Sequence, residues 1–293
     1  MITARRKRRN VNLQLFFAVV LYACCLYRIL TEQLVLEKEF QNIVFSFFYN
    51  ALFYRLLSLF LLAANTILLT FVVRWQGLIE LRNYYPSISY LLLSFLFPTV
   101  LNPLALFAGL IFIVGIFQNM FDLEENTINR KIFRFGFSVG ILALIHFPLV
   151  LLLFFAYLAC IMYRRFGFRI FLLSIVGILA PFLYWYSALY ITGYDFSFQE
   201  NIRQMGENLL KFQQFRITET PFVLIVTILL LGMGLKLMHK LWVASVKTSV
   251  LRRKKYYMLM IVFLFSIALA FLYSQFYLET FLIVYSVILA IRQ

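Results

Sequence analysis

Apolar residues form long blocks along this chain, and the polar residues between them gather in short segments. The first block covers residues 10–30 and the second covers residues 53–73. Each is about the length that a helix needs to cross a bilayer. Residues 170–191 and 221–235 form further apolar blocks later in the chain. The pattern predicts an all-α fold, a polytopic bundle of transmembrane helices.

Shorter apolar blocks come in pairs, which are 87–97 with 104–120, 133–147 with 149–163, and 256–273 with 277–291. Pro98 and Pro103 interrupt the first pair, and Pro148 interrupts the second. A full crossing needs about 20 apolar residues, so the first pair is predicted to form a short hairpin. For the second pair a hairpin is favoured over a single kinked helix, because it keeps Arg130 and Arg164 on the same side. Their irregular links must be shielded from lipid. With these pairs the sequence predicts about ten membrane segments.

Two polar stretches, 31–50 and 192–220, are predicted to lie at the outer membrane surface. The first is acidic and then aromatic, and the second carries apolar residues at roughly helical spacing. No linker or low-complexity stretch divides the chain, so residues 1–293 are expected to form a single integral membrane domain. Gly136 and Gly140 have the spacing that lets a second helix approach closely.

Composition agrees with lipid as the main solvent of this chain. Hydrophobic residues make up 63% of it, charged residues only 13%, and the mean hydropathy is +0.89. A soluble domain typically carries about 25% charged residues. The net charge of +15 would favour a nucleic-acid partner in a soluble protein. Here the basic residues are spread over several loops, so we expect anionic lipid headgroups and no nucleic acid.

The basic residues also orient the predicted bundle. In this threading 21 of the 27 Lys and Arg residues fall in segments that face the same side of the membrane. The outer loops carry four basic and seven acidic residues. Because basic residues flanking a membrane helix collect on the cytoplasmic side, both termini are predicted to be cytoplasmic.

Residues 65–193 resemble an uncharacterised family of bacterial multi-pass inner-membrane proteins. The motifs that carry the likeness are Asn83-Tyr84-Tyr85-Pro86, Ser94-Phe95-Leu96-Phe97-Pro98, Phe135-Gly136-Phe137-Ser138-Val139-Gly140, Phe147-Pro148 and Gly177-Ile178-Leu179-Ala180-Pro181. They are structural motifs, and the family has no established activity. The resemblance implies a location in the bacterial cytoplasmic (inner) membrane.

The same middle section is similar, more faintly, to polytopic glycosyltransferases that use polyprenyl-phosphate sugars. Those enzymes place an essential acid, usually Asp, in the loop after the first span. This chain has Glu32, Glu37 and Glu39 there. The resemblance implies a catalytic role for Glu37 and Glu39, as a general base or beside a divalent ion and a lipid-linked phosphate. The alternative is a solvated acidic loop.

Other polar residues within or beside the spans are candidate binding residues. Arg55 could bind a phosphate, or extend to the outer headgroups. Asn102 could line a cavity, cap a half-helix or form a plain turn. His146 could bind a substrate, shuttle protons or bind a metal, or it could form a hydrogen bond between helices. Glu279, close to the predicted outer end of its span, is either an ion relay or exposed at the interface.

Three classes of function fit these patterns. The first is an enzyme that acts on a lipid-linked envelope glycan precursor in a glycosyltransferase-like manner. The second is a transporter or flippase that uses the broken hairpins as gates. The third is a non-catalytic scaffold subunit. The sequence predicts no metal-ligand set and assigns no cofactor.

Overall fold

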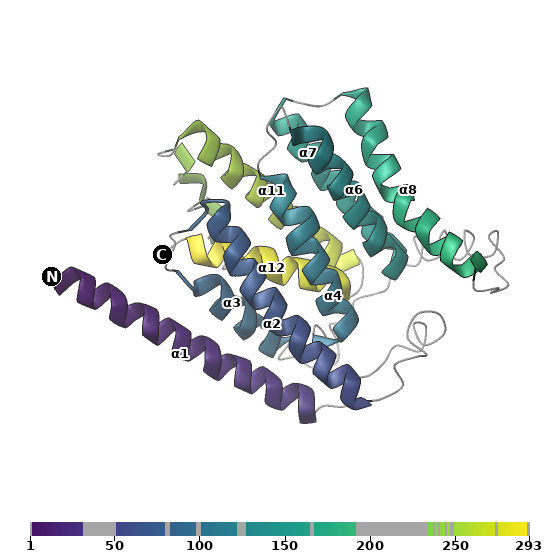
Figure 1. The fold of residues 1–293 in the computed structure, drawn as a ribbon. Helices are drawn as coiled ribbons and strands as arrows, with labels where there is room; N and C mark the ends of the chain where they lie inside the picture. Colours follow the sequence, from purple (N-terminus) through teal and green to yellow (C-terminus); the bar gives the residue numbers. More distant parts are fainter. Residues whose placement is uncertain are drawn as a thin grey trace. The chain divides into compact units, whose positions relative to one another are not determined.

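The structure is a computed structural model, and it describes residues 2–31, 51–79, 83–97, 101–121, 127–164, 167–191, parts of 232–246, 249–272 and 275–291. All regular structure in these residues is helical, so the predicted all-α fold is confirmed there (Figure 1). The described residues cluster into two compact units. The first unit comprises Met1–Leu110 and Leu278–Gln293, and the second comprises Ile111–Tyr277. The expectation of a single membrane domain stays a prediction.

Four helical stretches in the described residues are long and apolar enough to cross a membrane, which fits a membrane protein. They are Val11–Thr31, Leu52–Trp75, Pro103–Met120 and Phe168–Ala188. Three shorter apolar helices are Tyr85–Leu96, Phe147–Met162 and Leu278–Ile291. The prediction of about ten membrane segments is therefore not supported. Residues 221–235, counted as one of those segments, lie almost wholly outside the described residues.

The first unit contains α1 (Ile2–Thr31), α2 (Ala51–Trp75), α3 (Tyr85–Leu96), α4 (Pro103–Ile111, of which Ile111 belongs to the second unit) and most of α12 (Gln275–Ile291). Local sequence fixes where several of these helices begin and end. Pro86 lies in the first turn of α3 and Pro103 begins α4, where the missing N–H costs nothing. After α2, Gly77 has a φ of 65°. Its N–H bonds to the Arg74 carbonyl, and Leu78 N–H bonds to the Val73 carbonyl. This is a Schellman C-cap, which requires a left-handed residue.

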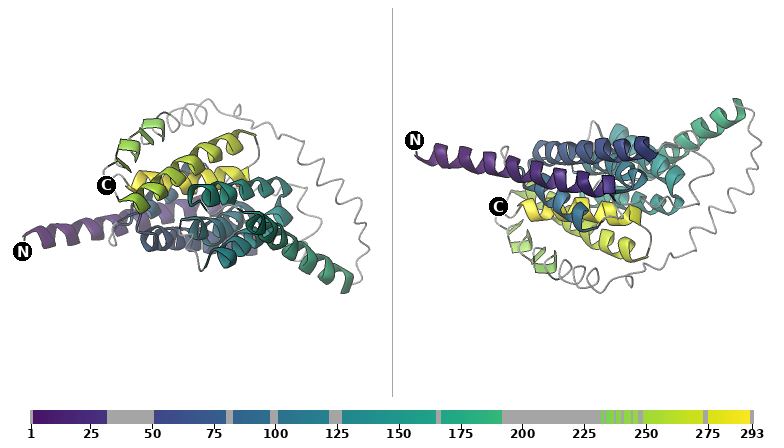
Figure 2. Two further views of the ribbon diagram at one scale, coloured as in Figure 1. Left: turned by 90° about the horizontal axis from the view of Figure 1, so that it is seen from above. Right: turned by 90° about the horizontal axis from the view of Figure 1, so that it is seen from below.

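Contacts along α1 show that it runs parallel to α3. The Gln14 side chain accepts from Tyr84 N–H at 3.1 Å, near the start of α3. Arg28, in the last turn of α1, donates to the Phe95 carbonyl and stacks over the Phe95 ring at 5.3 Å. The Arg28 guanidinium therefore bonds to a carbonyl in the last turn of α3. Figure 2 shows the first turns of α1 projecting beyond α2.

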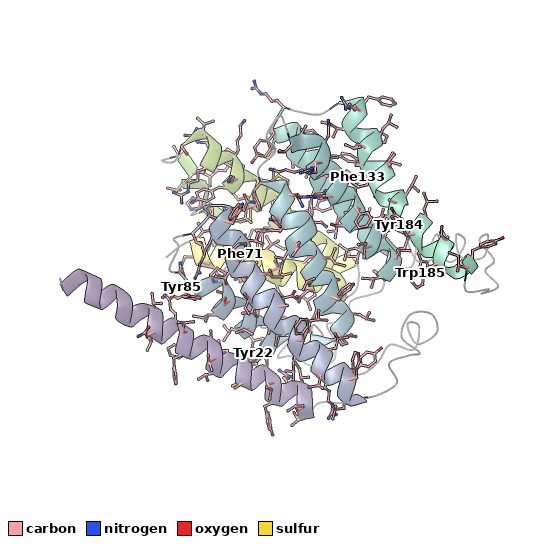
Figure 3. The ribbon with its side chains drawn as sticks, viewed as in Figure 1. Tyr22, Phe71, Tyr85, Phe133, Tyr184 and Trp185 are labelled. Carbon is pink, nitrogen blue, oxygen red and sulfur yellow. The ribbon has the colours of Figure 1, made fainter. Side chains whose placement is uncertain are left out.

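Hydrogen bonds also tie α2 to its neighbours. The Tyr22 hydroxyl of α1 donates to the Leu59 carbonyl at 2.9 Å, and Figure 3 shows this side chain between α1 and α2. Asn65 of α2 forms a hydrogen bond with Tyr90 of α3. Thr70 lies later on α2 than Asn65, and its partner Ser87 lies earlier on α3 than Tyr90. The two helices are therefore antiparallel, as successive membrane passes would be.

The second unit contains a π-helical stretch η4 (Phe112–Phe117), α5 (Gln118–Met120), α6 (Ile128–Ile145), a 3-10 stretch η6 (Phe147–Leu152), α7 (Leu153–Met162), α8 (Phe168–Ile191) and α11 (Val250–Leu272). His146 has extended backbone angles and ends α6 just before Pro148. The Tyr163 hydroxyl, after α7, donates to the Phe121 carbonyl at 2.7 Å, shortly before α6 begins. The chain therefore folds back between α6 and α7, and a hairpin within the membrane stays a prediction for this pair.

Glycines let α6 and α8 pack with their backbones in contact (Figure 1). A Cβ atom built on Gly136 would lie 2.4 Å from the Ser174 carbonyl oxygen. One on Gly140 would lie 2.5 Å from the Ile178 carbonyl oxygen, and one on Gly177 would lie 2.7 Å from the Phe133 carbonyl oxygen. Real Cβ atoms do not approach so closely, so glycine is required here. The close approach predicted from the Gly136 and Gly140 spacing is confirmed.

Candidate functional site

The most unusual side chain in the first unit is Glu279. It is the only acidic residue in the part of the chain that the structure describes. It is the fifth residue of α12, yet its exposed fraction is 0%. Its partner Asn65 lies near the middle of α2, an apolar helix long enough to cross a membrane. The interpretation of Glu279 as exposed at the interface is therefore wrong.

Side chains from α2 and α3 hold the Glu279 carboxyl group, and α4 is tied to them through Asn65. The Tyr90 hydroxyl of α3 donates to Glu279 Oε1. Asn65 Nδ2 of α2 lies 3.4 Å from the same oxygen, 3.3 Å from the Tyr90 hydroxyl and 2.8 Å from the Leu106 carbonyl of α4. The shortest of the Asn65 contacts, to Leu106, fixes the amide and ties α4 to the group. We call Asn65, Tyr90 and Glu279 the Glu279 cluster.

Gly109 of α4 makes the space that the carboxyl group occupies. A Cβ atom at this position would lie 2.5 Å from Glu279 Oε1 and 3.1 Å from Asn65 Nδ2. Both distances are shorter than ordinary van der Waals contact. The Glu279 cluster thus depends on a residue without a side chain, as well as on three polar side chains.

Two oxygens of the Glu279 cluster lack a hydrogen-bond donor among the described residues. They are Asn65 Oδ1 and Glu279 Oε2, both fully enclosed. The described partners of Glu279 are Tyr90 and Asn65, and neither side chain is a cation. A buried polar group without a partner costs free energy, and a buried charge without one costs more. The cluster is therefore costly as it stands.

A line of buried hydroxyls continues from the Glu279 cluster between α2 and α3. Thr70 and Ser87 share a hydrogen bond, and Ser87 Oγ also donates to the Thr66 carbonyl at 3.2 Å. Thr66, Thr70 and Ser87 have exposed fractions of 9%, 4% and 5%. Farther along, Arg74 donates to the Asn83 carbonyl and stacks on the Tyr84 ring at 4.2 Å. We call Thr66, Thr70 and Ser87 the hydroxyl stripe.

Of the residues predicted as sites from the sequence, Arg55 and Asn102 lie in the first unit and His146 lies in the second. Glu37 and Glu39 lie outside the described residues. Arg55 lies in the second turn of α2, partly exposed and ten residues before Asn65, about 15 Å along the helix axis. His146 belongs to the second unit, where its carbonyl accepts from Leu149 N–H at 2.9 Å.

Asn102 is a helix cap, one of the roles that its sequence suggests. Its side-chain oxygen accepts from Leu104 N–H at 3.1 Å, and its carbonyl accepts from Leu106 N–H at 3.0 Å. With Pro103 as the next residue, this is a standard start for a helix. Asn102 therefore positions α4, which carries the Leu106 carbonyl and Gly109 to the Glu279 cluster.

Sequence reasoning missed Asn65, Tyr90 and Gly109 because each is an ordinary residue within an apolar block. The available signal was Glu279, the one carboxyl group inside a predicted span. Within the described residues no group of three or more His, Cys, Asp or Glu side chains could hold a metal ion. No protein-family model, curated protein or solved structure matches this chain.

Proposed function

We propose that this protein is an ion-coupled transporter of the bacterial inner membrane, with both termini in the cytoplasm and Glu279 as its ion-binding carboxyl group. The observation that carries the proposal is the complete burial of Glu279 between apolar helices, where Tyr90 and Asn65 hold it. Ionisable side chains inside membrane bundles are rare and mark ion or substrate pathways.

A purely structural role for Glu279 explains the arrangement poorly. Replacing buried charged groups with well-packed apolar residues is often neutral or stabilising. In the second unit, α6 and α8 pack through glycines, without any carboxyl group at their contact. A buried carboxyl group with one unpartnered oxygen raises the free energy of the folded first unit. A role in binding and releasing an ion would explain why it is there.

The hydroxyl stripe supports a path from the Glu279 cluster toward one membrane surface. Thr66 and Thr70 lie between Asn65 and Arg74 along α2, and Ser87 lies beside them on α3. Hydroxyls can pass a proton or replace part of the hydration shell of an ion. With the N-terminus inside, this end of α2 faces the cytoplasm, so we place the cytoplasmic entrance near Arg74.

The glycosyltransferase-like alternative depends on Glu37 and Glu39, which lie outside the described residues, and on Arg55, which is about 15 Å along α2 from Asn65. It stays a prediction, with a lipid-linked substrate as its implied partner. No described contact favours the scaffold alternative. The geometry of the first unit favours transport over both.

The test is solid-supported membrane electrophysiology on proteoliposomes containing the full chain. Pools of amino acids, sugars, nucleosides and organic acids are perfused in turn, followed by pH steps. We expect at least one pool or step to produce a transient current that is absent in Glu279→Gln. Ser286→Ala is the matched control, because Ser286 is buried two turns farther along α12 and, within the described residues, its hydroxyl donates to the Ile283 carbonyl at 2.7 Å. Equal currents in Glu279→Gln and wild type, or none above protein-free liposomes, would overturn the proposal.

A further inference from the structure

We infer that the Glu279 cluster and Ser94 form a binding site for one monovalent metal cation, with Asn65 Oδ1, Ser94 Oγ and Glu279 Oε2 as ligands. The inference rests on the proposed function, which it deepens by naming the class of the coupling ion. It is drawn from three oxygens in the first unit. Each is enclosed. Asn65 Oδ1 and Glu279 Oε2 have no hydrogen-bond partner among the described residues, and the Ser94 hydroxyl has only an interaction with the Tyr90 hydroxyl that falls short of standard hydrogen-bond geometry.

The three oxygens lie in the same region of the first unit. Asn65 Oδ1 and Glu279 Oε2 are the free halves of the amide and the carboxyl group that contact the Tyr90 hydroxyl. Ser94 follows Tyr90 by four residues on α3, so it lies one turn farther on the same helix face. Its exposed fraction is 0%. Three helices thus supply one oxygen each.

The chemistry of these oxygens selects a hard cation. Carboxylate, amide and hydroxyl oxygens are ligands for cations such as Na⁺, and the set contains no nitrogen or sulfur. The Tyr90 hydroxyl and Asn65 Nδ2 both donate to Glu279 Oε1, so this oxygen and this amide nitrogen already have partners. That arrangement leaves Oε2 as the acceptor available to an ion.

Charge selects a monovalent ion. Glu279 is the only acidic side chain in the described part of the chain, and its described partners are neutral. One positive charge therefore neutralises the site, whereas a divalent ion would leave an uncompensated charge in an apolar surrounding. A proton on Glu279 would also neutralise the carboxylate. It would satisfy one or two of the three oxygens, whereas a metal ion can contact all three.

The test measures binding directly, on the purified full chain in detergent. Thermal unfolding is followed by tryptophan fluorescence while NaCl replaces choline chloride at constant ionic strength, and equilibrium dialysis with radioactive ²²Na⁺ gives the stoichiometry. We expect one Na⁺ per chain and a rise in Tm of several degrees, because a ligand that binds only the folded state stabilises it. KCl and LiCl series then rank the monovalent ions.

Glu279→Gln is expected to keep its fold and lose the Na⁺-dependent rise in Tm, while Ser286→Ala keeps it. If Glu279→Gln does not fold, Ser94→Ala replaces it as the test variant. That change removes one neutral ligand and is expected to weaken Na⁺ binding by about tenfold, which corresponds to about 1.4 kcal/mol.

Two results would overturn the inference. The first is an equal effect of Na⁺ on wild type and on Glu279→Gln, which would indicate a general salt effect. The second is no Na⁺ binding to a folded wild-type chain. If pH steps still drive Glu279-dependent currents in liposomes without Na⁺, the second result leaves the proposed function standing with a proton as the ion. Conversely, Na⁺ binding without any current would contradict the proposed transport function and leave the proposed Na⁺ site standing.

Discussion

The α6–α8 contact and the Glu279 cluster show two different ways of joining helices. Between α6 and α8, Gly136, Gly140 and Gly177 bring the two backbones together. In the first unit, Asn65, Tyr90 and Glu279 join three helices through polar side chains, and Gly109 makes room for them. Both solutions use glycine, but for opposite purposes. One removes side chains so that helices meet, and the other removes a side chain so that a carboxyl group fits.

The two contacts differ in how much of each is needed for packing alone. In lipid, helices associate mainly through van der Waals contact and hydrogen bonds, so a glycine contact is sufficient to hold a pair together. The α6–α8 contact needs nothing further. The Glu279 cluster leaves buried oxygens without donors among the described residues, which is a cost that packing does not require. Such a cost points to an ion or a proton as the missing partner.

The largest effect is expected at the glycine contact. In Gly136→Ala the new methyl group would meet the Ser174 backbone, which cannot move aside as a flexible side chain could. We expect a loss of about 3 kcal/mol of stability, measured by SDS titration or thermal unfolding. Gly232→Ala is the control, because a Cβ atom there would have no neighbour within 4 Å. Alanine favours a helix more than glycine does, so Gly136→Ala can lower stability only through the clash of its methyl group. Equal stability of both variants and wild type would therefore show that the two backbones are not in contact.

Tyr90→Phe should have the second largest effect. It removes the hydroxyl that donates to Glu279 Oε1 and accepts from Asn65, and keeps the ring that fills the space. Hydrogen bonds to charged groups contribute about 1.5–3 kcal/mol, so we expect a loss of about 2 kcal/mol in thermal unfolding. A double-mutant cycle with Glu279→Gln should give a coupling energy of about 1 kcal/mol. Purely additive effects would mean that the Tyr90 hydroxyl bonds no more strongly to the carboxylate than to the Gln amide.

Asn102→Ala tests how much the helix cap supports the Glu279 cluster. Loss of an N-cap side chain typically costs about 1 kcal/mol, which thermal unfolding can detect. Because α4 carries the Leu106 carbonyl and Gly109, we also expect weaker Na⁺ binding than in wild type. Asn102→Asp keeps a capping oxygen and serves as the conservative control. If Asn102→Ala alone lowers stability without changing Na⁺ binding, then the start of α4 does not position the cluster.

Glu279→Gln should have the smallest effect on stability, despite the complete burial of the side chain. The amide keeps the shape and can accept from Tyr90 and Asn65 while removing the buried charge. Removing an unpaired buried charge removes its desolvation cost, so we expect Tm in choline chloride to stay the same or rise, with a change within about 1 kcal/mol. A loss of several kcal/mol would show that the carboxylate is structural, and would remove the contrast with the α6–α8 contact.

Parts of this fold could be predicted because they follow from local pattern. Long apolar blocks predicted α1, α2 and α8, and the spacing of Gly136 and Gly140 predicted a close contact, although not that α8 makes it. Pro148 predicted the break at His146. The described residues do not support about ten membrane segments, because half-length apolar blocks can be buried within a protein as well as cross a bilayer.

The candidate site could be predicted only in part. A carboxyl group inside a span is a signal in itself, and Glu279 was weighed as an ion relay for that reason. Because Glu279 lies near the end of its helix, the sequence favoured a position at the membrane interface. Counting residues gives the depth of a helix end only when the helix starts at the membrane surface. Asn65 and Tyr90 could not be found without knowing that α2, α3 and α12 meet. That contact joins distant parts of the chain and depends on tertiary packing.

Gly109 and Glu279 occupy what is effectively one volume. A methyl group at position 109 would fill the space of the carboxyl oxygen, and that carboxyl group would no longer reach Tyr90. Side-chain length at 279 and side-chain size at 109 are therefore expected to vary inversely, so Gly109→Ala should be tolerated better with Glu279→Asp than alone. The residue tolerated at one of these two distant positions would then depend on the residue at the other.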